Sequence, residues 1–416
     1  MSDRPTVSVP QAGKRRAIDH AQMRSANMGL ILRHLRDHGA CSRAQLASGT
    51  GLSKATITSL VGSLVASQLV REGEVSRRGQ VGRPGTEVML NGERVWGVGL
   101  EINVDYLSYS VLDFASNVVC EGSEPLSPEE HAPEIVVLKV ARMIEGIMAK
   151  SGEATIAAIT ITPPGIIDYE KGIVRFAPNL GWRAVPVIQM LHDELGDVPM
   201  PLYLEADAKL AGLASYAEYR SSEVRDLVHL TGDVGVGIGI ISGGRLLRGW
   251  SGFSGEVGHM TLDPEGPRCR CGRKGCFELY VGLRPFLASL PVDSDARDAS
   301  IPLVERLESL RERMLSGDEE VLAALDVIKR DLVRGLGVIV DVLNPVILVL
   351  GGYFGYFAEV LVPFVDECLE ARLLDEGHRV EVVPGSMGIA AASRGGAMMA
   401  LERVFMEPDV LHSLTA

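Results

Sequence analysis

The sequence has no long hydrophobic run and few cysteines. No apolar stretch approaches the roughly 20 residues that a membrane-spanning helix needs, and no apolar signal-peptide core lies near the N-terminus. The six cysteines, three of which lie close together, do not resemble the framework of a secreted, disulfide-rich protein. We therefore expect a cytoplasmic protein that has no membrane partner.

Two common nucleotide-binding motifs are also missing. The chain contains no Gly-Lys-Ser or Gly-Lys-Thr of the P-loop type. The sequence Gly235-Val236-Gly237 is not a dinucleotide fingerprint, because Ile240 occupies the position of the third glycine. Neither a P-loop enzyme nor a dinucleotide-dependent oxidoreductase is indicated.

Charge is divided unevenly along the 416 residues, a length that suggests two or three domains. Residues 1–90 hold 13 basic side chains (two Lys and eleven Arg) against 6 acidic ones, a net charge of +7. The whole chain has 41 basic and 54 acidic residues, so residues 91–416 hold 28 against 48, a net charge of −20. This asymmetry favours a nucleic-acid-binding segment joined to an acidic body.

Residues 21–90 show the pattern of a winged helix-turn-helix domain. Apolar residues at helical spacing predict a first helix that ends near Gly39, and they are Met28, Ile31, Leu32 and Leu35. Ser42 can cap a short second helix and Ser53 a third, with the turn at residues 49–51 between them. Two short helices joined by a tight turn are typical of a reader of the DNA major groove.

The predicted third helix has an apolar face and a polar face. The apolar face is expected to be buried and consists of Ile57, Leu60, Val61, Leu64 and Val65. The polar side chains suit contacts with phosphates and base edges, and they are Lys54, Thr56, Thr58 and Ser59. This helix is therefore the candidate recognition helix for double-stranded operator DNA.

Residues 71–90 are predicted to form a β-hairpin with a basic tip, the wing of such a domain. Arg77, Arg78 and Arg83 lie at this tip, and Arg83 could enter a narrow minor groove. Residues 1–20 are polar and are expected to form a flexible tail. The alternative is a three-helix protein-interaction domain with a solvated basic loop. The helices, the wing and the local charge together favour DNA binding.

From residue 95 onward, strand and helix patterns alternate in two successive series. The first series has strands at residues 95–102, 107–114, 118–121, 156–162 and 202–205. Its one amphipathic helix is expected at residues 133–150, with Ile135 on the apolar side. The second series has strands at residues 226–230, 236–241, 245–247 and 346–350 and one long helix at residues 321–342. We expect an α/β body of two lobes, residues 95–215 and 216–416, with a cleft between them and a C-terminal helix packed back on the body.

One histidine and three cysteines within eighteen residues form a candidate metal site. The set is His259, Cys269, Cys271 and Cys276, the natural ligand set of a closed tetrahedral zinc site. Gly272 and Gly275 allow the tight turns that bring neighbouring sulfurs to one metal. Disulfides or ordinary buried thiols are the alternative, which the close spacing disfavours. A site with four protein ligands leaves no position open for water, so we expect structural zinc.

Several of these motifs together resemble the ROK family of repressors and sugar kinases. They comprise Pro164-Gly165 with Asp168, Asp207, Glu256-x-Gly258-His259, the cysteine frame ending in Glu278, and Asn344-Pro345 leading to Gly351-Gly352. The resemblance spans roughly residues 95–400, and the winged helix is typical of the family's regulators of the xylose-repressor or N-acetylglucosamine-repressor type. It implies an actin-like (ribonuclease-H-like) two-lobed fold in a homodimer or homotetramer.

The resemblance also implies roles for individual residues. It assigns the zinc ligands to His259 and the three clustered cysteines, and contacts with sugar hydroxyls to Glu256, His259 and Glu278. Asp207 matches the base that deprotonates a sugar hydroxyl in the kinases. From spacing alone, Asp207 could equally be a helix cap. Ala206 stands where the family has an asparagine, so one hydrogen-bonding amide is absent.

The phosphate-binding part of the family pattern is degenerate. Kinases of the family have an acidic residue followed by a Gly-Gly-Thr phosphate loop on the first hairpin, where this chain has Glu101-Ile102-Asn103-Val104-Asp105-Tyr106. Branched side chains there block the approach of the backbone to phosphates, and Asp105 and Asp233 repel them. We therefore expect no catalytic residues and no kinase activity.

The sequence predicts a sugar-responsive transcriptional repressor of carbohydrate genes. A homodimer would place two winged helices on two DNA half-sites, and a monosaccharide or phosphosugar in the cleft would change their spacing. The first alternative is an ATP-dependent sugar kinase with a fused DNA-binding domain. The second is a sensor that responds to a protein partner.

Overall fold

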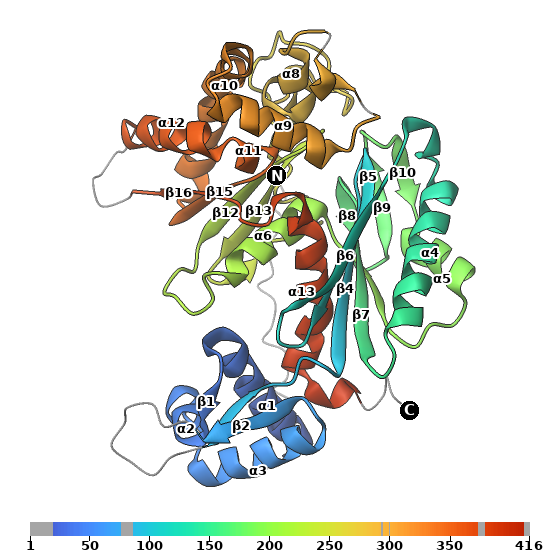
Figure 1. The fold of residues 1–416 in the computed structure, drawn as a ribbon, viewed down its shortest axis with the longest axis vertical. Coiled ribbons are helices and arrows are strands. Elements are labelled where there is room, and N and C mark those ends of the chain that lie inside the picture. Colours follow the sequence, from blue (N-terminus) through green and yellow to red (C-terminus); the bar gives the residue numbers. More distant parts are fainter. Residues whose placement is uncertain (1–19, 76–85, 293, 299, 373–378, 412–416) are drawn as a thin grey trace, which may run out of the picture.

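The chain forms a small N-terminal domain and two α/β lobes, with a long helix, α13 (Ala391–Met406), between the lobes (Figure 1). The computed structural model describes residues 20–75, 86–292, 294–298, 300–372 and 379–411. Among the helices in these ranges, none has the length and apolar character needed to span a membrane.

The N-terminal domain combines three helices with a three-stranded antiparallel sheet. The helices are α1 (His20–His38), α2 (Arg43–Thr50) and α3 (Lys54–Ala66). The strands are β1 (Cys41–Ser42), β3 (Thr86–Leu90) and β2 (Val70–Val75), in that spatial order. The three predicted helices and the predicted hairpin are thus confirmed, while the tip residues Arg77, Arg78 and Arg83 lie outside the described residues.

Local hydrogen bonds explain where these helices begin and end. The Ser42 hydroxyl accepts a bond from the Gln45 amide in a complete capping box, and the Ser53 hydroxyl accepts one from Thr56. Gly51 ends α2 in the left-handed conformation, with φ of 73°. The predicted burial of Val65 is wrong: its side chain is 37% exposed. It lies just past the buried stripe that Ile57 to Leu64 form on one side of α3.

The first lobe is built on a five-stranded sheet with the spatial order β11-β7-β4-β5-β6. Its strands are β4 (Val95–Ile102), β5 (Tyr106–Asp113), β6 (Val118–Pro125), β7 (Thr155–Thr162) and β11 (Leu202–Leu204). The helices beside it are α4 (Pro133–Lys150) and α5 (Val187–Leu195), with a short 3-10 turn at Pro128–Glu130. A second, three-stranded sheet contains β8 (Ile166–Asp168), β9 (Ile173–Ala177) and β10 (Trp182–Val185).

The second lobe repeats this topology. Its sheet has the order β14-β13-β12-β15-β16, with β12 (Leu227–Gly232), β13 (Val236–Ser242), β14 (Arg245–Leu246), β15 (Ile347–Gly352) and β16 (Glu381–Pro384). In each sheet the first strand of the series pairs antiparallel with the second and parallel with the fourth. This repeat is the two-lobed, actin-like arrangement that the sequence predicted.

Helices cover the outer part of the second lobe (Figure 1). They are α7 (Glu278–Val281), α8 (Leu283–Ala288), α9 (Leu303–Leu315), α10 (Glu319–Leu343), α11 (Tyr353–Tyr356) and α12 (Ala358–Glu370). Short 3-10 turns occupy Val257–His259, Asp295–Arg297, Gly388–Ala390 and Pro408–Val410. The long helix predicted at residues 321–342 is α10, with two and one additional residues at its ends.

Two helices pack against each other at the centre of the molecule. Helix α6 (Asp207–Ala217) lies against β12 and β13, whereas α13 lies against β4, β5 and β7 and against α6. The contacts are close because a Cβ on Gly99 would overlap the Ser393 carbonyl, and one on Gly395 would overlap the Leu210 carbonyl. Both helices begin near the cleft between the lobes, since Asp207 and Ala391 line one hollow there.

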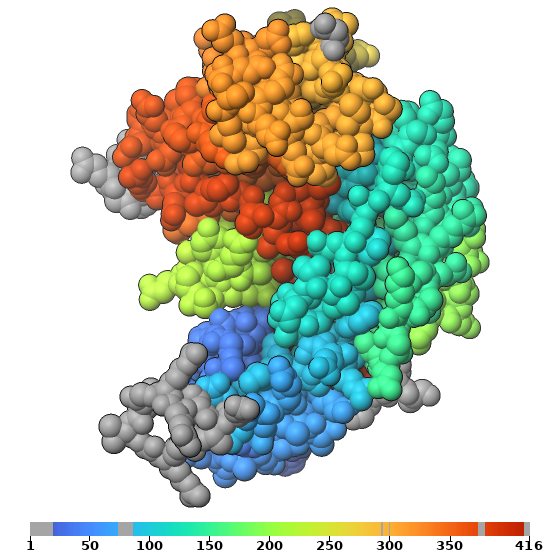
Figure 2. All heavy atoms as spheres, viewed as in Figure 1, coloured from blue at the N-terminus to red at the C-terminus, as the bar shows by residue number. Residues whose placement is uncertain are grey.

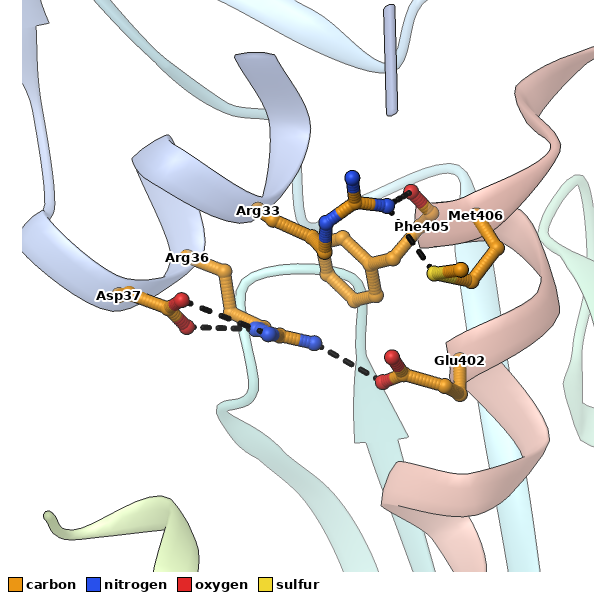
Figure 3. Close-up of polar contacts among 6 residues, drawn as sticks. All are labelled: Arg33, Arg36, Asp37, Glu402, Phe405 and Met406. Atoms are coloured by element: carbon orange, nitrogen blue, oxygen red, sulfur yellow. Dashed lines mark hydrogen bonds and ion pairs between the residues drawn. The ribbon is translucent and has the colours of Figure 1, made fainter. Parts of the chain in front are cut away.

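The far end of α13 joins the N-terminal domain (Figures 1 and 3), which adjoins the first lobe in the space-filling view (Figure 2). Arg33 on α1 donates to the Phe405 carbonyl at 3.1 Å, and Arg36 pairs with Asp37 at 2.8 Å and Glu402 at 2.9 Å. The Phe405 ring lies under the Arg36 guanidinium, with 4.9 Å to its centroid. Apolar residues of the N-terminal domain, the first sheet and α13 form a single hydrophobic core across this junction. The N-terminal domain is therefore packed on the body rather than tethered to it.

The prediction that Ile135 lies on the apolar side of its helix is wrong. Its side chain is 40% exposed, whereas α4 buries the stripe from Val136 to Ile147 against the first sheet. The helix itself has the predicted bounds, 133–150. The apolar face is thus rotated by one residue, because Val136 and Val137, rather than Ile135, begin the buried i, i+3, i+4 series.

Candidate functional site

The four predicted metal ligands converge on one point. The ligand atoms of His259, Cys269, Cys271 and Cys276 all lie within 4.8 Å of one another. The sulfurs of Cys271 and Cys276 are 3.6 Å apart, and the Cys269 sulfur is 3.7 Å from Nδ1 of His259. Ligands at about 2.3 Å from a tetrahedral zinc ion are separated by about 3.8 Å, so the donors fit that geometry. A sulfur–sulfur distance of 3.6 Å is far too long for a disulfide, and all three thiols are free.

Short turns hold this cluster in place. Isolated bridges pair Thr261 with Cys276 and Arg268 with Lys274, so the cysteine loop folds back on itself. Burial raises the pKa of the Cys276 thiol to about 11 and also raises that of Cys269. Burial lowers the pKa of His259, which favours the neutral imidazole. The cluster can hold a divalent cation, which would stabilise thiolates at this buried position.

The predicted sugar-binding residues line a single cavity between the lobes. Asp207, Glu256, His259 and Glu278 all border it, and His259 Nδ1 is 3.4 Å from Glu278 Oε1. Glu256 precedes the 3-10 turn at Val257–His259 and His259 ends it, while Asp207 begins α6 and Glu278 begins α7. A Cβ on Gly258 would overlap the Val236 carbonyl, so a glycine lets this turn lie against β13. The metal cluster and the cavity share His259 and adjoin at Glu278, whose Oε1 lies 2.9 Å from the Cys269 sulfur.

Burial controls the charge of the carboxyl groups in the cavity. It raises the pKa of Asp207 to about 6 and that of Glu256 to about 7. A bond of 2.6 Å from the Ala208 amide to Asp207 opposes the shift, and so does the positive charge of Lys209. Carboxyl groups with such pKa values can accept hydrogen bonds from hydroxyls and, when protonated, donate one. The cap interpretation of Asp207 is wrong, because Ala206 is the N-cap of α6 and no side chain caps this helix end. Asp207 is the first residue of the helix, accepts only the neighbouring Ala208 amide and borders the cavity.

Some residues that the sequence did not mark as candidates also border the cavity. Lys209 is 2% exposed, and its ammonium donates to the Gly252 carbonyl at 2.6 Å. Asn103 and Asn179 also line the cavity, and a Cβ on Gly235 would lie 3.3 Å from the Asn179 amide nitrogen and 3.6 Å from Glu278 Oε2. A lysine in a helix is usually solvated, and nothing in the local sequence marks Lys209 as buried. Asn103 lies within the degenerate loop. The departure of this loop from the kinase pattern indicated a lost phosphate site and did not mark Asn103 as a residue that borders the cavity.

The end of strand β4, just before its loop, carries a buried glutamate at the penultimate residue of the strand. Glu101 is 2% exposed and accepts hydrogen bonds from Tyr106 at 3.0 Å and from Asn103 and Ser108 at 3.3 Å. Burial, and then the charge of Asp207, raises the pKa of Glu101 to about 8. The pKa of Asp233 is raised well above its usual range by burial and by Glu101. Asp168, part of the family pattern, lies in β8 and does not border the cavity.

The residues predicted to contact DNA occupy the N-terminal half of α3. Lys54, Thr58 and Ser59 are exposed, and the Thr58 hydroxyl donates to the Lys54 carbonyl at 2.9 Å. Thr56 is half-buried, and its hydroxyl is 2.8 Å from that of the capping Ser53. The side chains of Lys54 and Ser59 take no part in these local bonds, and Lys54 begins the helix, where the N-terminal amides attract phosphate.

Comparison with known proteins identifies the family. The sequence matches the ROK family over residues 97–403. The chain belongs to the ROK family. It is 28% identical to the xylose repressor of Bacillus spizizenii over 388 residues, which is 92% of this chain and 97% of that protein.

Two solved structures show the fold across the family. A ROK family transcriptional regulator, described as a homologue of the Escherichia coli MLC protein, has a TM-score of 0.73 at 21% identity and covers 95% of this chain and 100% of its own. A ROK family glucokinase from Streptomyces griseus, in complex with glucose and AMPPNP, has a TM-score of 0.63 at 22% identity and covers 73% of this chain and 98% of its own. The regulator thus matches nearly the whole chain, whereas the kinase matches about three quarters of it.

Proposed function

We propose that this ROK protein is a sugar-responsive DNA-binding repressor of carbohydrate genes. The observation that carries the proposal is the convergence of Asp207, Glu256, His259 and Glu278 on one cavity in a body that is packed against a winged helix-turn-helix domain. Carboxyl groups recognise vicinal hydroxyls through charge-assisted hydrogen bonds, and this makes a sugar the ligand that fits. The name of the xylose repressor relative supports the same assignment.

In this mechanism, sugar binding changes the closure of the lobes and thereby the position of the winged helices. Helix α13 runs from the hollow behind the cavity to α1, so a shift at one end is transmitted to the other. Two winged helices of a homodimer or homotetramer would contact two operator half-sites through Lys54, Thr56, Thr58 and Ser59, with Arg77, Arg78 and Arg83 in the wings. We assign the functional units to residues 21–90, 95–215 and 216–416, with α6 packed on the sheet of the second lobe and α13 on the sheet of the first.

We further propose that the metal is a structural zinc ion. His259, Cys269, Cys271 and Cys276 would hold it, and it supplies positive charge that keeps the thiolates and imidazole in one place. Because His259 also borders the cavity, the ion fixes the ring that contacts the sugar. Glu278 is kept close to the same cluster.

Kinase activity is the competing function, because a ROK family glucokinase has the same fold. The degenerate loop opposes it, because the branched side chains of Ile102 and Val104 would block the approach of the backbone to phosphates, and Asp105 and Asp233 would repel them. A coupled ATPase assay with a panel of sugars separates the two functions. We expect no turnover, whereas turnover that disappears in Asp207→Asn would establish a kinase.

A thermal-shift screen of monosaccharides and phosphosugars tests the proposed sensor. We expect at least one sugar to raise the melting temperature of the wild-type chain and to have no effect on Glu256→Ala. Glu312→Gln is a matched control, because Glu312 is exposed on α9 and far from the cavity in sequence and fold. A sugar that stabilises Glu256→Ala as strongly as the wild type would contradict the assignment of the cavity.

A further inference from the structure

One loop of the second lobe reaches across the cleft to the first lobe. It spans residues 247–255 and follows β14, and we call it the strap. Both ends of the strap are hydrogen-bonded to β13, since the Leu247 amide donates to this strand at 2.8 Å and the Gly255 carbonyl accepts from it at 3.0 Å. Between these ends its backbone lies against β8 of the first lobe, because a Cβ on Gly252 would lie only 2.5 Å from the Ile167 carbonyl. The strap therefore joins the two lobes by direct contact.

An ion pair fastens the strap to the first lobe. Nε of Arg248 bonds to Oε2 of Glu205, whose own amide donates to β7 at 3.1 Å. The Glu205 side chain is 2% exposed, whereas that of Arg248 is 34% exposed. The Arg248 guanidinium also lies over the ring of Tyr169, which follows β8, with 5.5 Å to the ring centroid. Among the described residues no other cation pairs with Glu205, so this buried carboxylate depends on a charge that the other lobe supplies.

The strap is also tied to the residues that line the cavity. Lys209 on α6 is buried, and its ammonium donates to the Gly252 carbonyl of the strap at 2.6 Å. Lys209 borders the cavity, as do Ser254 and Gly255 at the end of the strap. Glu256 follows the strap directly and borders the same cavity. A movement of the strap therefore moves a side chain that faces the proposed ligand.

The cavity is smaller than a pocket that holds a small molecule. Its volume is about 70 Å³, whereas such pockets commonly measure roughly 300–1,000 Å³. Its lining comes from both lobes, with Pro164 and Gly165 from the first and Gly235 and Glu256 from the second. A sugar-sized molecule can enter only after the lobes separate. Because the strap belongs to one lobe and contacts the other, this separation breaks its contacts.

The two partners of the ion pair respond differently to its loss. Arg248 is already partly solvated, so water can replace Glu205 at little cost. Glu205 is buried, and a buried carboxylate that loses its cation is strongly destabilised unless water reaches it. Opening of the lobes is the movement that brings water to Glu205. The intact pair therefore favours the closed cleft, and removal of the cation alone favours the open one.

We propose that the strap is a latch between the lobes, and that the Arg248–Glu205 ion pair keeps the cleft closed until the latch releases. Arg248 is a positioning residue, because it does not border the cavity and acts on it through the strap and Glu256. The latch goes beyond the proposed sugar sensing, since it controls access to the cleft whatever molecule enters.

Hydrogen exchange of the ligand-free, full-length chain tests the latch. In Arg248→Gln we expect amide exchange in residues 163–170 and 247–256 to be at least about tenfold faster than in the wild type. The double variant Arg248→Gln/Glu205→Gln has no buried charge, so its exchange should return to within about threefold of the wild type. Arg245→Gln, at an exposed arginine of β14, is the matched control and should change nothing. Small-angle X-ray scattering should give a larger radius of gyration for Arg248→Gln alone.

Two results would overturn the latch. One is wild-type exchange in Arg248→Gln. The other is fast exchange that persists in the double variant, because it would mean that Arg248 acts through packing rather than through the charge of Glu205. Should Arg248→Gln fail to fold, Arg248→Lys keeps the charge but lacks the Nε donor, and its exchange should rise at least about threefold; an unchanged rate there also overturns the latch. No sugar is present in these experiments, so a failure of the sensor function leaves their result intact.

Discussion

The cleft between the lobes and the α1–α13 junction use charged residues in opposite ways. At the junction, Arg36 lies between Asp37 and Glu402 and above the Phe405 ring, so each charge has a partner. In the cleft, Glu101, Asp207 and Asp233 adjoin one another, and their pKa values are raised. Paired charges fix the orientation of two packed elements. Crowded acids instead destabilise the empty site and are relieved by a ligand that supplies hydrogen bonds.

Disruption of the proposed zinc site should have the largest effect, and it should be confined to the cleft side of the comparison. Cys276→Ser removes one of four ligands from the cluster, so we expect the zinc content of the purified protein to fall from about one ion per chain to nearly none. Hydrogen exchange should rise in residues 256–280 and stay unchanged in α1. Cys368→Ser, at a cysteine outside the cluster, is the control. An unchanged zinc content would show that the cluster is not the metal site.

Truncation of Phe405 should destabilise the α1–α13 junction and leave the metal cluster unchanged. Its ring is buried and stacks on Phe114 with centroids 4.4 Å apart, so Phe405→Ala should lower the free energy of unfolding by about 3–5 kcal/mol. Urea denaturation measures this loss, and hydrogen exchange should increase in α1 and α13 while the zinc content is retained. Increased exchange in the cysteine loop alone would contradict the separation of the two regions.

The raised pKa of Glu101 predicts a pH-dependent effect of intermediate size. Because the folded-state pKa is about 8 and the ordinary value is 4.5, the buried carboxyl group destabilises the fold increasingly as the pH rises through this interval. Glu101→Gln cannot ionise, so its stability relative to the wild type should increase by about 1–3 kcal/mol between pH 5 and pH 8. The hydrogen bonds that Glu101→Gln loses lower its stability by the same amount at pH 5 and at pH 8. A stability difference that is flat over this range, measured by urea denaturation, would contradict the shift.

The smallest effect is expected at the Arg36–Glu402 pair. Glu402 is 43% exposed, and ion pairs of this kind contribute about 0.2–1 kcal/mol. Glu402→Gln should therefore lower stability by less than about 1 kcal/mol and leave sugar binding unchanged. Arg403→Gln, which removes a neighbouring exposed pair with Glu407, is the matched control. A loss as large as that of Phe405→Ala would mean that charge, rather than packing, holds the junction.

Regular periodicity and capping made most of the fold predictable. The helix at residues 133–150 and the strand at residues 95–102 have the predicted bounds because their apolar patterns are uninterrupted. The sheet β8–β9–β10 was missed because its strands are only three to five residues long and alternate weakly. Val65 and Ile135 were misplaced by one helical position at the margin of an apolar face, where tertiary packing alone decides burial.

The site was predictable where residue types are unusual for their position. The four metal ligands and the four cavity residues were all visible as motifs, and their convergence in space is a property of the fold. Lys209 and the burial of Glu101 were not predictable, because both depend on the packing of α6 and β4 against distant segments. The acid cluster in particular joins residues from three separate parts of the chain.

Operator binding in the presence of sugar tests the central claim most directly. An operator is first selected from random DNA, and its affinity is then measured by fluorescence anisotropy with and without a sugar that stabilises the protein. We predict that the sugar changes the dissociation constant of the wild-type chain at least about fivefold and does not change that of Glu256→Ala. An operator affinity that no sugar alters, in a chain that does bind sugar, would contradict the coupling between the cleft and the winged helix.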